Sequence, residues 1–133
     1  MAELDYAFLC DFASIENGKL TAVGASFTHV RAPELPSMHV FSVAGRIRSL
    51  QGAPPIEVRL ELTSPDSAYQ LDVSSTLRPG AEIRPYDGKI GLLFAASLNL
   101  PLVSAGLYEV RVYLDDELAR RLAFEVESQH QAS

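Results

Sequence analysis

The fold is decided by residues 106–126, which read GLYEVRVYLDDELARRLAFEV. Apolar and polar residues alternate there in two runs, one before and one after Asp115 and Asp116, and period-two alternation is typical of half-buried strands. The apolar positions that share one face are Tyr108, Val110, Val112, Leu114, Leu122, Phe124 and Val126. The stretch therefore predicts a β-hairpin that closes a sandwich, with the two aspartates at its tip.

A second hairpin is predicted around Asn17 and Gly18, because this dipeptide suits a type I′ turn with positive φ at both central residues. A two-residue turn also fixes the register, so residues whose numbers sum to 35 should face each other. On the face expected to join the core, the pairs are Phe12 with Val23, Cys10 with Ala25, Phe8 with Phe27, and Tyr6 with His29.

The opposite face of this hairpin carries small apolar side chains, with few charges for a surface in water. If it shares a sheet face with the strand near residue 93, the patch is large enough to mark an interface. The candidate interface residues are Leu9, Ala13, Ala22, Leu93 and Ala95. The alternative is that the sheets curl and cover this face internally.

Four further strands are expected between the hairpins, at about 38–48, 56–62, 69–73 and 89–100. With about eight short strands, turn signals between them and no helical period, the chain is predicted to be all-β, an antiparallel two-sheet sandwich of immunoglobulin-like type. A flattened barrel is the alternative. Residues 89–100 are apolar on both faces, which favours a central or doubly covered strand. Tyr108 resembles the tyrosine that closes a sandwich corner through its hydroxyl.

The length of 133 residues fits a single domain over residues 1–126, followed by a disordered tail at 127–133. Cys10 is the lone cysteine, so no internal disulfide can form and a cytoplasmic protein is expected. No apolar run is long enough to span a bilayer. The net charge of −6 disfavours nucleic acid and anionic membranes as partners.

Two segments carry a resemblance to a known family. The first is Leu4 to Ala13 with Gly18 to Gly24, and the second is the closing Gly106-Leu-Tyr108 strand with Phe124-Glu-Val126. Together they resemble a bacterial family of small single-domain proteins known only as a domain of unknown function. The resemblance implies a bacterial, cytoplasmic protein with no established activity. Its shared motifs are structural, so it assigns no catalytic or ligand-binding residue.

Three histidines raise the question of a metal site. The proline-flanked loop after His29 could bring His39 close, with Glu34 between them in the sequence, while His130 lies near the C-terminus. The spacing matches no known ligand motif. A cross-strand Tyr/His pair beside an unrelated surface histidine is the simpler interpretation, and no metal or cofactor is predicted.

Other reactive groups have structural interpretations as well. Cys10 lies between aromatic residues on a predicted core face, where a thiol packs as a small hydrophobe. Asp115 and Asp116 suit a solvated hairpin tip. Arginines could attract phosphates but alternate with glutamates, which favours cross-strand ion pairs. These arginines are Arg46, Arg48, Arg59, Arg120 and Arg121, and the glutamates are Glu57, Glu61 and Glu125.

The sequence therefore predicts a non-enzymatic protein interaction or assembly module. It would bind a protein partner, or itself as a homodimer, through a sheet face or an unpaired edge. The alternative function is a small metal-dependent hydrolase or ligand-binding protein that uses the loop region of His29, Glu34 and His39.

Overall fold

The computed structural model describes residues 2–80 and 83–129, which form ten strands and one short 3-10 turn, η1 (Pro65–Ser67). The strands are β1 (Glu3–Cys10), β2 (Phe12–Glu16), β3 (Lys19–Val23), β4 (His29–Ala32), β5 (Ser37–Leu50), β6 (Ile56–Thr63), β7 (Gln70–Leu77), β8 (Lys89–Leu102), β9 (Gly106–Leu114) and β10 (Glu117–Ser128).

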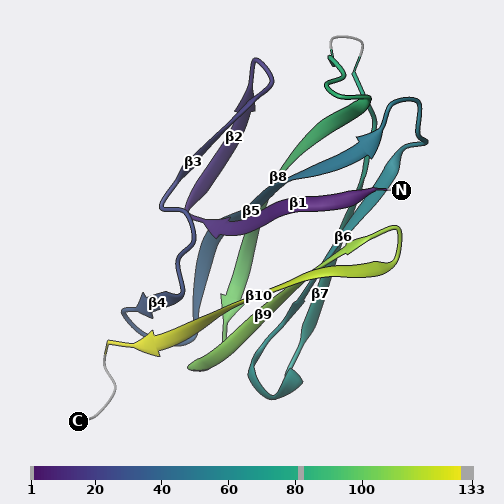
Figure 1. Ribbon diagram of the computed structural model, residues 1–133. Helices are drawn as coiled ribbons and strands as arrows, with labels where there is room; N and C mark the ends of the chain where they lie inside the picture. Colours follow the sequence, from purple (N-terminus) through teal and green to yellow (C-terminus); the bar gives the residue numbers. More distant parts are fainter. Residues whose placement is uncertain (1, 81–82, 130–133) are drawn as a thin grey trace.

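Two sheets pack face to face, as Figure 1 shows. One has three strands in the order β1-β5-β8, and the other has five in the order β4-β10-β9-β6-β7. All pairings are antiparallel except that of β4 with β10. The predicted fold class, an all-β antiparallel sandwich, is confirmed. The strand number was underestimated, because the two expected N-terminal strands divide into β1 with β2 and β3 with β4.

The core lies between the sheets and comes from the alternating positions of both. Phe41, Val43 and Ile47 of β5 face Val110 and Val112 of the opposite sheet, and all five are fully buried. An aromatic cluster fills one end of the core, with Phe124 in ring contact with Tyr108, Phe41 and Phe27. This arrangement confirms the period-two pattern as the source of the core.

The closing hairpin is confirmed. β9 and β10 pair as expected around Asp115 and Asp116, whose φ values of 47° and 67° make a tight turn. The corner tyrosine is also present. The Tyr108 hydroxyl donates a hydrogen bond to the Ser104 carbonyl (2.8 Å) and accepts one from the Val103 N–H (3.2 Å). It therefore provides hydrogen-bond partners for backbone groups of the loop that enters β9.

The N-terminal hairpin is only half as long as expected. β2 and β3 pair in the predicted register, with Asn17 and Gly18 at φ 53° and 72°. At Asp11 the chain bends, and β1 pairs with β5. Ser26 still donates one backbone hydrogen bond to the Leu9 carbonyl at 2.6 Å, in the predicted register, but residues 25–29 form no ladder with β1. Pairing of Cys10 with Ala25, Phe8 with Phe27 and Tyr6 with His29 is therefore wrong. The turn sets only local contacts, whereas the 14-residue β5 offers β1 a buried partner.

The two faces of this segment are exchanged relative to the prediction. In β1 the core-facing residues are Ala7 and Leu9, at 8% and 3% exposure. In the hairpin, Phe12 and Val23 were expected in the core but are 57% and 56% exposed. Both faces are apolar, so alternation locates them without saying which one turns inward.

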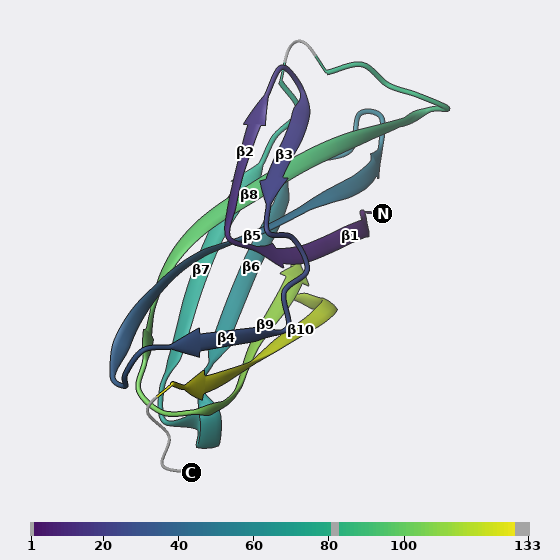
Figure 2. The ribbon, with the colours of Figure 1, turned by 90° about the vertical axis from the view of Figure 1, so that its left-hand side faces the viewer.

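The hairpin β2–β3 lies against the outer face of the three-stranded sheet, beside β5 and β8 (Figure 2). Ala44 and Ser42 point outward from β5 yet are 0% and 2% exposed, because the hairpin region covers them. Cys10 is buried opposite Ser42, and its thiol donates a hydrogen bond to the Ser42 carbonyl at 3.7 Å. Burial, with a smaller effect of Asp11, raises the pKa of this thiol.

The position of β8 and the end of β10 differ from the prediction. β8 was expected to be central or doubly covered, but among the described residues it pairs only with β5 and forms the edge of its sheet. The predicted tail from residue 127 begins too early, because β10 continues to Ser128 and pairs Glu127 and Ser128 with Arg31 and Ala32 of β4. His130 lies outside the described residues.

Candidate functional site

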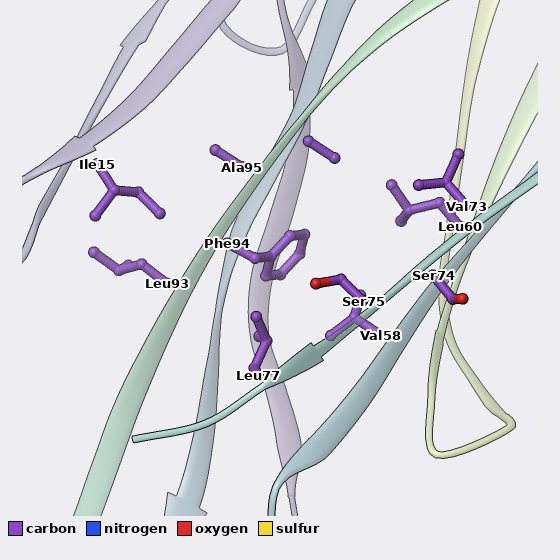
Figure 3. A pocket seen from close by; sticks show the side chains of 11 residues that line it. Ile15, Val58, Leu60, Val73, Ser74, Ser75, Leu77, Leu93, Phe94 and Ala95 are labelled. Carbon is purple, nitrogen blue, oxygen red and sulfur yellow. The ribbon is translucent and has the colours of Figure 1, made fainter. Parts of the chain in front are cut away.

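A groove separates the edge strands of the two sheets, β7 and β8. Its volume is about 240 Å³, larger than a 150 Å³ apolar cavity that can hold benzene. The lining residues come from four strands and are apolar apart from two serines: Ile15, Val58, Leu60, Val73, Ser74, Ser75, Leu77, Leu93, Phe94, Ala95 and Ala96. In Figure 3 the Phe94 ring projects from β8 toward the β7 side of this groove.

The groove exists because β7 extends past the edge of the opposite sheet. Val73 and Leu71 pair with Leu60 and Leu62 of β6 and share their inward face. The two β6 leucines are each 2% exposed, but Val73 and Leu71 are each 39% exposed. The three-stranded sheet ends at β8, so the inward side chains of β7 have no strand opposite them.

The strand orders show why β8 ends its sheet. The β1-β5-β8 sheet corresponds to strands A, B and E of an immunoglobulin sandwich, and β10-β9-β6-β7 corresponds to G, F, C and C′. Constant-type sandwiches place the strand that follows C beside E, as strand D, whereas here that strand is β7 and pairs with β6. Here the described residues between β7 and β8, 78–80 and 83–88, form no strand and contribute only a Tyr86–Lys89 bridge. The position of strand D is therefore open.

The β8 edge is also uncharged. Residues 90–102 contain no Asp, Glu, Lys, Arg or His over thirteen positions, whereas the other edge strands β1, β4 and β7 each contain a charged side chain. Natural proteins usually protect long edges with charge, proline or cover. Only Lys89 and Pro101 serve that purpose on β8. About half of its backbone polar groups point away from β5, as in any antiparallel edge strand.

The predicted interface residues fall in three places. Leu9 lies in the core and cannot form an external contact, so its assignment to a surface is wrong. Ala13 and Ala22 pair with each other and are half-buried. They lie on the hairpin face that turns toward the three-stranded sheet, so for these two residues the alternative holds in which the face is covered internally. Leu93 and Ala95 lie on the outer face of β8 and line the groove.

The outer side of the groove is formed by the hairpin. Ile15 of β2 and Leu93 of β8 line it together, and Figure 3 shows their side chains on the same side of β8.

At the far end of β8, the Tyr69 hydroxyl donates a hydrogen bond to the Pro101 carbonyl and joins the two sheets. Burial raises the pKa of Tyr69 to about 12, so this hydroxyl keeps its proton at neutral pH.

Val73, Ser75 and Leu77 of β7 were not predicted as site residues. The sequence predicts a strand only at about 69–73, whereas β7 continues to Leu77. Sequence pattern also does not reveal which strands end a sheet. The long uncharged run at 90–102 is a signal that could have located the other wall, because such runs rarely remain as bare edges.

The structure does not assemble the histidine loop into a ligand set. His39 lies in the aromatic cluster, stacked on Phe41 with a centroid distance of 5.3 Å and in edge contact with Phe27. His29 is exposed and hydrogen-bonds to Thr28. Within residues 2–80 and 83–129, no group of three His, Cys, Asp or Glu side chains has a metal-binding arrangement.

His39 should make the fold sensitive to acid. Burial lowers its pKa below the ordinary 6.5, against a smaller opposing effect of Asp11. The unfolded chain therefore binds the proton more readily, and the free energy of unfolding should fall as pH drops from about 6.5 toward the folded-state pKa. Urea titrations between pH 7.5 and 5 measure this slope.

One variant separates His39 from the general acid response. His39→Phe keeps a ring in the cluster and should flatten the dependence over this range. If His39→Phe keeps the wild-type slope, the ring does not titrate as described.

The arginines form ion pairs on the outer faces of both sheets. Arg46 pairs with Asp5 at 2.6 Å, and Arg48 pairs with Glu3 at 3.3 Å, both on β1. On the other sheet, Arg59 pairs with Glu61 along β6, and Arg121 of β10 pairs with Glu109 of β9. Cross-strand ion pairs are present as expected, but their acidic partners differ from the prediction: Arg46 and Arg48 use acidic residues of β1, and Arg121 uses Glu109.

In the part of the chain that the structure describes, no helix has the length and hydropathy needed to cross a bilayer. Residues 5–127 match the model of a family of unknown function, DUF6941. No curated protein matches the chain.

Two solved structures are similar to the chain. An immunoglobulin-like protein from Pseudomonas aeruginosa has 16% sequence identity and a TM-score of 0.48, with 96% of this chain and 97% of that chain covered. The alkylpurine DNA glycosylase AlkC from Pseudomonas fluorescens, bound to DNA containing an abasic site analog, has 10% identity and a TM-score of 0.45. That match covers 91% of this chain and 30% of the glycosylase.

Proposed function

We propose that this chain, which belongs to the family of unknown function DUF6941, is a non-enzymatic protein interaction module that binds by strand addition. An extended, uncharged segment of a partner protein pairs with β8 and occupies the open position at the edge of its sheet. The lone, buried Cys10 is compatible with a reducing, cytoplasmic setting.

One observation carries the proposal: the inward side chains of β7 remain exposed across from an unpaired, uncharged β8 edge. A strand added to β8 would lie one strand spacing, about 4.8 Å, beyond it and so across from β7. It would satisfy the outward N–H and C=O groups of β8. It would also cover Val73 and Leu77, so affinity would come from both the backbone and apolar burial.

The chemistry of the partner follows from the two walls. The groove lining offers no charge to a guest side chain, and a charged group placed there would lose its hydration without gaining an ion pair. The outer wall, formed by Ile15 and Leu93, is apolar as well. A segment that alternates polar and charged residues is therefore excluded, while aliphatic and threonine-rich strands fit.

A capped ten-residue peptide of alternating threonine and valine, with one leucine at a central valine position, serves as the probe. We expect saturable binding by fluorescence anisotropy. Ala95→Lys and Ser75→Lys place a charge on β8 and on β7, respectively, at exposed positions, and each should weaken binding at least tenfold. Such charges near an edge block strand addition.

Leu118→Lys is the matched control, because Leu118 is 55% exposed on β10, which β9 and β6 separate from β7 and which does not belong to the sheet of β8. This variant should bind the peptide like the unmodified protein. The proposal is overturned if no saturable binding occurs up to about 1 mM peptide, or if the three lysine variants bind equally well.

A further inference from the structure

The position beside β8 has room for one strand. In the five-stranded sheet, β7 already extends past the edge that β8 forms in the other sheet. If a second copy paired its β8 with this edge, the β6 and β7 strands of that copy would have to occupy the same space as β7 of the first copy. A two-fold axis through the β8 edge would make the two five-stranded sheets collide. The occupant is therefore a single segment of another chain.

Within this position, one site is shaped for a bulky side chain. The core-facing residues of β8 run through Phe94, Ala96 and Leu98. The Phe94 ring lies over Gly45 of β5, where a Cβ would come within 2.8 Å of it. Phe94 thus fills the space left by a glycine, and the small Ala96 leaves the groove empty beside it.

We propose that the added segment anchors itself by one bulky aliphatic side chain, directly opposite Ala96, in the groove bounded by Val73, Ser75 and Leu77. This rests on the proposed strand addition and specifies its partner. Directly opposed residues in an antiparallel pair share a sheet face, so the residue opposite Ala96 turns into the groove. A volume of about 240 Å³ accepts a leucine or isoleucine side chain.

A size exchange tests the anchor. Two peptides are compared, the leucine peptide above and the same peptide with alanine in place of leucine. The unmodified protein should bind the leucine peptide at least tenfold more tightly, since three buried carbon groups are lost with alanine. Ala96→Leu fills the groove from β8 and should abolish this preference. Ser75→Leu fills it from β7, at an exposed position, and should do the same if Ala96→Leu folds poorly.

The outcomes separate the two proposals. An equal leucine preference in the unmodified and both filled proteins overturns the anchor while leaving strand addition in place. Binding of neither peptide overturns strand addition itself. Light scattering should give a monomer mass; a dimer that Ala95→Lys dissociates would overturn the assignment to a single segment of another chain.

Discussion

Replacing Leu9 with lysine is expected to unfold the protein or to lower its free energy of unfolding by more than about 4 kcal/mol. Leu9 is 3% exposed and belongs to the core between the sheets. The substitution removes a buried aliphatic side chain and leaves an ammonium group without a partner. A domain of ordinary stability has about 5–15 kcal/mol in all, so the loss is visible as a lower thermal midpoint and reduced soluble yield.

Ala95→Lys provides the matched control, because it introduces the same charge at an exposed position of β8. Its effect on stability should stay within about 0.5 kcal/mol. A Leu9→Lys protein with a near-normal thermal midpoint would place Leu9 at the surface and reverse the orientation of β1.

Phe124→Ala should cost about 3–5 kcal/mol in urea unfolding. Phe124 is 1% exposed and touches the rings of Tyr108, Phe41 and Phe27. Each aromatic pair adds to the energy of area burial, and no neighbouring element can shift to fill so central a gap.

Phe12→Ala makes the comparison sharp. Phe12 is 57% exposed on the hairpin β2–β3, so its truncation should change stability by less than about 0.5 kcal/mol. Similar losses for the two phenylalanines would mean that the hairpin packs with its other face inward, as the sequence pattern alone predicts.

The contrast between these residues shows where sequence reasoning is reliable. In the closing hairpin one face is apolar and the other is charged, so alternation determines both register and orientation. In the N-terminal segment both faces are apolar. The Asn17-Gly18 turn fixes the register of β2 and β3. The pairing of β1 with residues 42–48 of β5 is determined by long-range packing, which the turn does not encode.

The candidate site is predictable on one side only. Leu93 and Ala95 were singled out because their surroundings carry too little charge for an exposed strand, and both line the groove. The other wall, Val73 and Ser75, depends on how far one sheet extends past the other. Such an offset follows from the strand order of two sheets, which no local pattern encodes.

The most direct test of strand addition at β8 is residue-by-residue amide hydrogen exchange, measured by NMR with and without a saturating amount of the leucine peptide. Alternate amides of β8, those that point away from β5, should exchange at least tenfold more slowly in the complex, while the amides of the edge strands β1 and β4 keep their rates. Protection confined to β1 or β4, or peptide binding with unchanged exchange along β8, would contradict the account.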